Sequence, residues 1–280
     1  MSLTFLIIFA LRQTIKMSLY QRIAENLQYI SPSFYKSRYF KGLHNLSKDN
    51  FSVRNVEPEL VWIKEYLSED AVILDIGANV GTFLYQLEKK LDHHHIYAFE
   101  PNKKLYTRLK RLFPSMKVLS LALSDENTTA EFKVPVINGK KVASRGTLNT
   151  SYKEKGEEKS FTEKVTVAKL DDWAETEKLQ KLDFIKIDVE GNEMKTLLGG
   201  KRTIQQFLPT LMVEMEQRHH EKPIWGEISE VESWGYEAHY LNRSHFKLEK
   251  LTEEILVNNI NDEKNKTEYI NNIIFIPKTF

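Results

Sequence analysis

The chain has 280 residues, with 40 Lys and Arg against 39 Asp and Glu, so its net charge is only +1. Apolar residues make up 41% and charged residues 28%, which excludes a wholly disordered or fibrous chain. A net charge near zero argues against a nucleic-acid-binding protein that works through bulk charge. The sequence contains no Cys, which excludes disulfides, thiolate nucleophiles and Cys-based zinc sites, and a cytoplasmic location is the simplest expectation.

Residues 1–56 are expected to form a basic helical arm, followed by a catalytic domain over residues 57–280. The apolar run at 5–11 is too short to span a membrane, and Arg12 and Lys16 follow it, so secretion is not expected. The first 48 residues hold seven Lys and Arg and one acid, Glu25. Because these charges are scattered, packing on the main domain is favoured over the alternative, peripheral contact with the inner face of an anionic membrane.

From residue 57 onward, strand-like and helix-like segments alternate. Short apolar runs predict main strands at 71–76, 95–99, 117–121, 183–189, 211–215, 236–241 and 272–276. Helical spacing of apolar residues predicts helices at 59–67, 82–91, 103–113, 193–206 and 223–233. Two further strands, 130–134 and 163–168, flank a polar stretch at 139–160 that is expected to be a mobile loop. This order predicts a Rossmann-like, doubly wound α/β fold with a mostly parallel sheet, whose ligands bind beyond the carboxyl ends of the strands.

The first two predicted strands end in residues suited to hold a nucleoside. The first ends near Asp75 and leads to Gly77 and Gly81, which permit a tight turn and a close approach of the backbone to a ligand. The second ends at Glu100, where a carboxylate can accept hydrogen bonds from both hydroxyls of a ribose. Together these residues predict a nucleoside-type ligand.

The loop sequence also bears on which nucleoside binds. A dinucleotide fingerprint needs a third glycine in the G-x-G-x-x-G spacing, which this loop lacks, and Asp75 would repel a pyrophosphate. The same carboxylate suits a ligand with an ammonium group. S-Adenosylmethionine therefore fits better than NAD, while an NAD-type oxidoreductase and a non-catalytic cofactor-binding scaffold stay as alternatives.

Four separated motifs resemble the FkbM family of class I S-adenosylmethionine-dependent methyltransferases. They are DIGANVGTF at 75–83, AFEP at 98–101, ALSD at 122–125 and KIDVEGNE at 186–193. The resemblance covers roughly residues 57–216 and implies a seven-stranded sheet and, most often, methyl transfer to a hydroxyl. It implies a small-molecule or glycan acceptor, such as a sugar or a secondary metabolite. No nucleic-acid partner is expected, because the sequence has no Asn-Pro-Pro-aromatic motif to hold a base and indicates no strong basic surface.

The resemblance further implies which residues hold the methyl donor. Four residues of the first loop would hold its methionine end: Asp75, Gly77, Asn79 and Gly81. Glu100 would bind the ribose, and Asp188 would also lie against the donor. Ser124 and Asp125 would lie near the adenine, and the alternative for this pair is an ordinary turn.

Three carboxylates are candidates for the base that takes the proton of an acceptor hydroxyl. Asp188 and Glu190 follow the fourth main strand, and Glu214 ends the fifth. A structural or cofactor-contacting role is the alternative for Asp188, and stabilisation of a helix N-terminus is the simpler interpretation for Glu190 and Glu193. Magnesium held by Asp188 and Glu214 would be compatible with the sequence, but the spacing does not require it and no metal is predicted.

The remaining polar motifs carry weaker predictions. The histidines at 93–95 are expected to form a solvated turn, and a surface loop is favoured for His219 and His220 over a role as the base. Within the polar stretch, three residues either belong to a lid that closes over the substrate or have no role: Ser144, Arg145 and Thr147.

Overall fold

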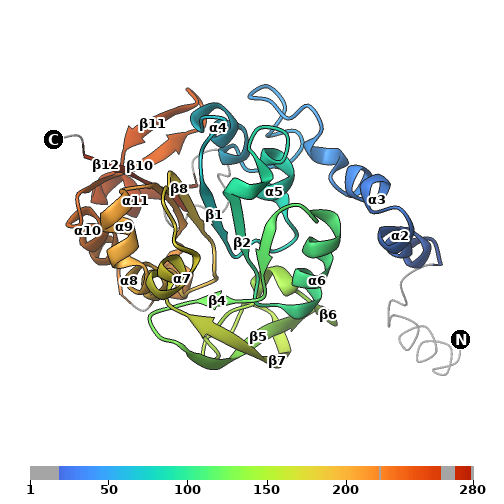
Figure 1. The fold of residues 1–280 in the computed structure, drawn as a ribbon. Coiled ribbons are helices and arrows are strands. Elements are labelled where there is room, and N and C mark those ends of the chain that lie inside the picture. Colours follow the sequence, from blue (N-terminus) through green and yellow to red (C-terminus); the bar gives the residue numbers. More distant parts are fainter. Residues whose placement is uncertain (1–18, 221, 260–268, 279–280) are drawn as a thin grey trace, which may run out of the picture.

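The computed structural model describes residues 19–220, 222–259 and 269–278. Figure 1 shows a main sheet between two groups of helices, a second small sheet below it, and a helical arm that projects beside α6. The apolar run at 5–11 lies outside the described residues. None of the helices in the described part of the chain combines the length and apolar character needed to cross a bilayer.

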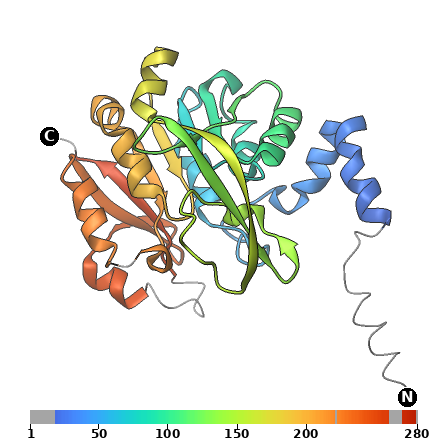
Figure 2. The ribbon, with the colours of Figure 1, turned by 90° about the horizontal axis from the view of Figure 1, so that it is seen from below.

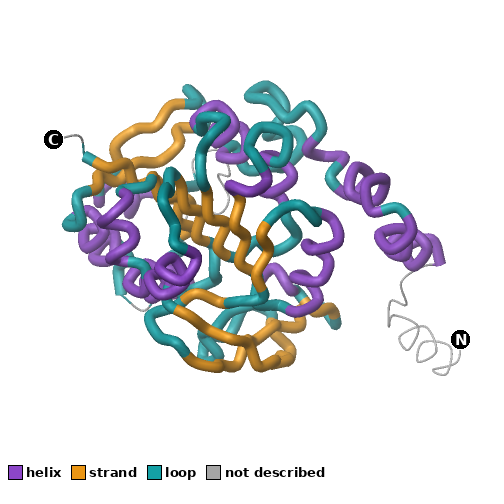
Figure 3. The backbone as a smooth tube through the Cα atoms, in the orientation of Figure 1, coloured by secondary structure: helices purple, strands orange, loops and turns teal. Residues whose placement is uncertain are grey.

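The main sheet of the described residues has eight strands in the order β11-β10-β12-β9-β8-β1-β2-β3. Five neighbours run parallel and occupy its middle and one edge: β1 (Ile73–Ile76), β2 (Ile96–Phe99), β3 (Lys117–Leu119), β8 (Phe184–Ile187) and β9 (Thr210–Glu214). Figure 3 shows these strands at the centre of the molecule. Three strands with antiparallel pairings complete the other edge: β12 (Asn272–Pro277), β10 (Tyr236–Asn242) and β11 (Lys247–Lys250).

The mostly parallel α/β sheet is therefore confirmed, but the expected count of seven strands is wrong by one for the described residues. All seven predicted main strands are present, and β11 is the additional one. Its sequence, KLEK, has no apolar run, because β11 lies at the edge of the sheet and pairs only with β10. A pattern search for buried strands cannot find such a segment.

Helices cover both faces of the sheet, as a doubly wound fold requires. One core cluster includes Ile73 and packs against α4 (Glu59–Tyr66), α5 (Thr82–Leu87) and α6 (Lys103–Leu112). The other includes Leu74 and packs against four helices: α7 (Leu170–Glu177), α8 (Glu193–Gly199), α9 (Lys201–Phe207) and α10 (Trp225–Glu232). Successive strand residues thus serve opposite faces. The single helix predicted over 193–206 is two helices divided at Gly200, and α11 (Glu253–Asn259) and α7 were not predicted.

The second sheet has the order β4-β7-β5-β6 and is built on a long antiparallel ribbon (Figure 2). Its strands are β4 (Ala122–Leu123), β5 (Thr128–Ile137), β6 (Lys140–Lys141) and β7 (Glu157–Ala168). The polar stretch at 139–160 is therefore not a loop throughout, because it includes β6, the short helix η3 (Ala143–Arg145) and the start of β7. Backbone hydrogen bonds between Lys133 and Thr147 tie this stretch to β5.

The N-terminal arm consists of α2 (Leu19–Ile30), α3 (Pro32–Tyr39) and the 3₁₀ turn η1 (Lys41–Leu43). Phe40, which follows α3, is buried and stacks on Tyr85 of α5 with 4.6 Å between ring centroids. The arm thus shares one core cluster with α4, α5 and α6. The division of the chain at residues 56 and 57 stays a prediction.

Candidate active site

Three adjoining cavities lie at the carboxyl ends of the central strands. Cavity A is bounded by the strand ends and the second sheet, and its lining includes Gly77, Asn79, Phe99, Glu100, Leu121, Leu123, Phe132, Ser144, Asp188 and Glu190. Cavity B is lined by residues that include Asn55, Val56, Glu57, Asn79, Phe83, Lys186 and Asp188. Cavity C is lined by residues that include Asn55, Val56, Glu57, Arg145, Tyr152, Glu154, Glu216, Arg218, Tyr269 and Asn271.

Shared residues join these cavities into one continuous site. Asn79 and Asp188 line both cavity A and cavity B, and Glu57 lines both cavity B and cavity C. The empty space, including the parts open to solvent, is about 530 Å³ in A, 680 Å³ in B and 1980 Å³ in C. The site therefore offers two compact compartments and one much larger opening.

The loop after β1 is held by the ends of β2 and β8. The backbone N–H groups of Gly77 and Ala78 both donate to the carbonyl oxygen of Phe99, each at 3.0 Å. Gly77 has φ +82°, and a Cβ there would lie 1.8 Å from the carbonyl oxygen of Asp188. Glycine is thus required at this position by the neighbouring strand, in addition to any ligand that the loop faces.

Gly81 makes a close packing contact, and its predicted contact with the donor stays a prediction. It has φ +90°, and a Cβ there would meet the side chains of Leu109 and Phe113 at 2.7 Å. Gly81 lines none of the three cavities. In this structure the glycine permits close packing of the loop on α6, a long-range contact that the sequence does not display.

Glu100 holds the loop and faces cavity A. Its two carboxylate oxygens accept hydrogen bonds from the backbone N–H groups of Asn79 (2.7 Å) and Asn102 (2.8 Å). Burial raises the pKa of Glu100 to about 7. The Oδ1 atom of Asn79 is buried and accepts no hydrogen bond from the described residues, so it is an unsatisfied acceptor between cavities A and B.

Asp75 is placed differently from the expectation. It is 1% exposed and lines none of the three cavities. Lys186 is its direct neighbour in the parallel register of β1 and β8, and the Lys186 Nζ atom lies 3.5 Å from Asp75 Oδ1 and 3.1 Å from Asp188 Oδ2. The ammonium group that faces Asp75 in this structure is therefore that of Lys186. A contact of Asp75 with the ammonium group of the donor stays a prediction.

Ser124 and Asp125 form a turn beside cavity A without lining it. The Ser124 hydroxyl donates to Asp125 Oδ1 at 3.1 Å, and the Ser124 backbone N–H donates to the carbonyl oxygen of Ala168. The cavity wall here comes from the preceding residues, Leu121, Ala122 and Leu123. The structure thus favours the alternative of an ordinary turn.

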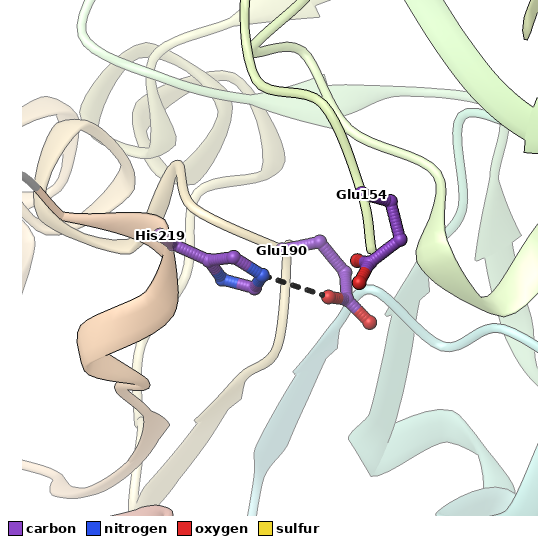
Figure 4. A group of neighbouring side chains, drawn as sticks. All are labelled: Glu154, Glu190 and His219. Carbon is purple, nitrogen blue, oxygen red and sulfur yellow. Dashed lines mark ion pairs between the residues drawn. The ribbon is translucent and has the colours of Figure 1, made fainter. Parts of the chain in front are cut away.

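The turn after β8 carries Glu190 toward a buried polar cluster (Figure 4). Glu190 has φ +54°, a left-handed conformation that costs free energy for a residue with a side chain. Its Oε2 atom lies 3.4 Å from His219 Nε2 and 3.2 Å from an Arg218 guanidinium nitrogen. Burial and the nearby Asp188 raise the pKa of Glu190 to about 8.

His219 corrects a second expectation. Its side chain is 5% exposed, so the predicted surface loop is wrong for this residue. The ring of Tyr152 meets the imidazole edge-on with 4.9 Å between centroids, and burial lowers the pKa of His219 to about 4. His219 is therefore a neutral imidazole beside the Glu190 carboxyl group. The histidines at 93–95 form the short helix η2 (His93–His95), directly before β2.

Glu154, Glu190 and His219 could be taken for a metal site, because their ligand atoms lie within 4.8 Å of one another. Two guanidinium groups already neutralise this cluster. Arg218 lies 2.7 Å from Glu154 Oε2, and Arg145 lies 3.0 Å from Glu154 Oε1. The carboxylates therefore serve ion pairs in this structure, and the geometry provides no independent reason to place a metal ion there.

The two remaining acids near Asp188 differ in role. Glu214, at the end of β9, accepts a hydrogen bond from Asn271 at 2.9 Å, and burial together with the Asp188 carboxylate raises its pKa well above the usual value. Glu193 accepts hydrogen bonds from the backbone N–H groups of Val189 and Gly191. These contacts hold the turn before α8, and stabilisation of the helix start by Glu193 stays a prediction.

Residues of the second sheet cover the site. Ser144 lines cavity A, Arg145 lines cavity C, and the Thr147 hydroxyl donates to the carbonyl oxygen of Glu190 at 2.7 Å. The predicted lid residues thus lie over the strand ends, while their movement stays a prediction. The polar residues of cavity C that sequence analysis missed include Tyr152, Glu154, Arg218 and Tyr269.

Comparison with known proteins decides the family. Residues 75–241 match the methyltransferase FkbM domain. The chain belongs to the FkbM methyltransferase family. It is accordingly a methyltransferase, and the family implies S-adenosylmethionine as methyl donor, which removes the NAD-type alternative.

Individual relatives agree with this family. The chain is 27% identical to the 2-O-methyltransferase NoeI of Sinorhizobium fredii, over 55% of this chain and 68% of NoeI. It is 30% identical to the hexuronic acid methyltransferase AglP of Haloferax volcanii, over 50% of this chain and 54% of AglP. A crystal structure of methyltransferase FkbM from Methylobacillus flagellatus aligns at 14% identity and a TM-score of 0.46, over 75% of this chain and 44% of that one. That structural likeness is too weak to add to the assignment.

Proposed function

We propose that the protein transfers a methyl group from S-adenosylmethionine to a hydroxyl oxygen of a sugar that binds in cavity C. The observation that carries the proposal is the position of Asp188, which lines both compact cavities and lies beside the Glu214 carboxyl group. The two sugar-modifying relatives support the choice of acceptor class. When bound, S-adenosylmethionine supplies an electrophilic methyl group.

The residues of cavities A and B fit this donor. Glu100 keeps carboxylate lone pairs for ribose hydroxyls, while the apolar side chains of Phe99, Leu123 and Phe132 provide walls suited to a base. In cavity B the unsatisfied Asn79 Oδ1 and the Asp188 carboxylate offer acceptors for an amino group. Gly77 lines cavity A, and its contact with the methionine end of the donor stays a prediction.

Asp188 is the base that the site supports best. An acceptor hydroxyl must be held close to the methyl carbon, and a carboxylate must take its proton. Glu190, with a pKa of about 8, is largely protonated at neutral pH and is a poorer proton acceptor there. The raised pKa of Glu214 favours its protonated form in the same way. Asp188 is in an ion pair with Lys186 and lies at the junction of the cavities.

Cavity C has the chemistry of a carbohydrate site. It presents two tyrosines, Tyr152 and Tyr269, whose rings can stack on a sugar face. Its Arg218, Glu154 and Glu216 offer donors and acceptors that are held in place by their mutual ion pairs. Fixed polar groups of both kinds suit a ligand with many hydroxyls.

The experiment is a transfer assay with S-adenosylmethionine labelled in its methyl group. Neutral methyl glycosides, hexuronates and amino sugars would be tested as acceptors, and NMR would locate the new methyl group. We expect an O-methyl ether on a sugar hydroxyl. Transfer to nitrogen or to a carboxylate, or failure to methylate any sugar while the donor binds, would contradict the proposal.

A further inference from the structure

Two segments far apart in the sequence concentrate positive charge on one side of the molecule. Residues 19–43 and 103–112 together hold nine Lys and Arg and one acid, Glu25, whereas the whole chain has a net charge of +1. Figures 1 and 2 show that α2 and α3 of the first segment lie beside α6, which is the second. We call the exposed side of these three helices the arm–α6 surface.

Specific contacts make this surface a single unit. The guanidinium of Arg108 lies 4.0 Å from the centre of the Tyr39 ring, and that of Arg111 lies 4.0 Å from the centre of the Tyr29 ring. Arg108 also donates to the hydroxyl of Tyr35 at 2.9 Å. Lys104, Arg108 and Arg111 follow one another at helical spacing, so Lys104 extends this stripe of cations along α6. The aromatic rings and the cations are thus interleaved.

Apolar side chains project from the same unit. Ten large apolar side chains are exposed in the described part of the chain, and four of them belong to the arm: Tyr29 (64%), Ile30 (81%), Phe34 (56%) and Tyr39 (42%). Exposed Lys103, Lys104 and Lys110 lie on the adjoining helix. Exposed apolar groups rimmed by polar residues mark an interaction site.

We propose that the arm–α6 surface docks the enzyme on an anionic lipid bilayer. Lysines at such a surface are attracted by its negative potential, while aromatic and aliphatic side chains enter the headgroup region. Binding of a nucleic acid would account for the cations, but its charged backbone would not bury the exposed side chains of Ile30 and Phe34. The sequence that leads into α2 has the same composition, with FLIIFAL at 5–11 followed by Arg12 and Lys16.

The test is cosedimentation of the full chain with vesicles of pure phosphatidylcholine and with vesicles that also contain phosphatidylserine. We expect binding to the anionic vesicles that weakens as salt is added. The triple variant Lys103→Glu, Lys104→Glu, Lys110→Glu should weaken this binding by about tenfold or more. Its matched control changes three exposed lysines of β7, α8 and β11, namely Lys164→Glu, Lys195→Glu and Lys247→Glu, and should bind nearly as well as the wild type.

A second pair of variants tests the apolar part. The double variant Ile30→Ser, Phe34→Ser should lose binding to anionic vesicles, whereas Val257→Ser, which changes a 61% exposed residue of α11, should not. Circular dichroism and thermal unfolding would verify that all variants fold. Equal binding to neutral and anionic vesicles, equal losses in the two triple variants, or binding to DNA without binding to vesicles would overturn the proposal. Self-association through this surface in place of vesicle binding would overturn it as well.

Discussion

Cavities A and C lie at the same end of the sheet but are built from different parts of the chain. Every residue that lines cavity A falls between 76 and 192, within the span that matches the family domain. Cavity C also takes six residues between 51 and 58, before that span, and Arg243, Ser244, Tyr269 and Asn271 after it. Cavity A, proposed for part of the donor, thus lies within the family domain, whereas cavity C, proposed for the acceptor, is completed by residues outside that domain. The following predictions test that division.

The largest effect is expected at the junction of the two compartments. Asp188→Asn should reduce turnover by about 10²–10⁴-fold, because the acceptor hydroxyl loses its base, while the donor affinity changes far less, since the Asn amide oxygen can still accept a hydrogen bond from the donor's amino group. Turnover would be measured with the acceptor found in the transfer assay, and donor affinity by calorimetry. Asp125→Asn, an exposed change outside the three cavities, is the control and should leave both unchanged. Near-normal turnover in Asp188→Asn would move the role to Glu190 or Glu214.

Gly77 tests whether the donor loop is fixed by the fold itself. Gly77→Ala would place a Cβ 1.8 Å from the Asp188 carbonyl oxygen, so we expect the free energy of unfolding to fall by about 3 kcal/mol or more. Gly139→Ala, at φ +70° with open space around it, is the matched control and should cost about 1–2 kcal/mol. Denaturant unfolding measures both. Equal losses would show that left-handed backbone strain alone explains the glycine.

The shifted pKa of His219 predicts that the stability of the folded protein depends on pH. Its pKa is lowered from 6.5 to about 4 in the folded protein. Between pH 6.5 and pH 4, His219 is therefore protonated in the unfolded chain but stays neutral in the folded protein. Stability should therefore fall as the pH falls through this window, by at most about 3 kcal/mol from this residue. His219→Gln should flatten that fall in urea unfolding, whereas exposed His94→Gln should not. An unchanged slope in His219→Gln would contradict the shift.

Glu100 is the corresponding test on the donor side. Glu100→Gln should weaken donor binding by about 10–100-fold, because one oxygen that accepts hydrogen bonds becomes an amide nitrogen that only donates them. Calorimetry with S-adenosylmethionine would measure the change, with the exposed Glu126→Gln as control. If both variants bind the donor equally well, the ribose does not contact Glu100.

The smallest effect is expected from Arg218, in cavity C. Arg218→Ala should raise the KM for the acceptor by about tenfold and leave the donor Kd unchanged, since Arg218 lines cavity C and lines neither cavity A nor cavity B. Arg202→Ala, which breaks an exposed ion pair with Glu175, is the control. A change in donor Kd would show that the two compartments are not separable.

The sequence was sufficient to predict where a residue lies when its position depends on neighbours along the chain or on the order of the strands. Glu100 and Asp188 lie at strand ends, and both were found because parallel strands bring their carboxyl ends to one edge. Lys186 was missed as the partner of Asp75, because that pair depends on the register between β1 and β8. The burial of His219 was missed for a similar reason, since Tyr152 and Glu190 reach it from two other elements. Long-range contacts of this kind leave no local pattern.

The segment at residues 55–57, which forms a wall shared by cavities B and C, bears on the order in which donor and acceptor bind. Asn55, Val56 and Glu57 line both, so an acceptor seated in cavity C would rest against the outer wall of the methionine compartment. On the opposite side, the Thr147 hydroxyl ties the second sheet to the Glu190 peptide above cavity A. If the sugar binds in this way, we expect a compulsory order, with the nucleoside entering before the sugar and its demethylated form leaving last.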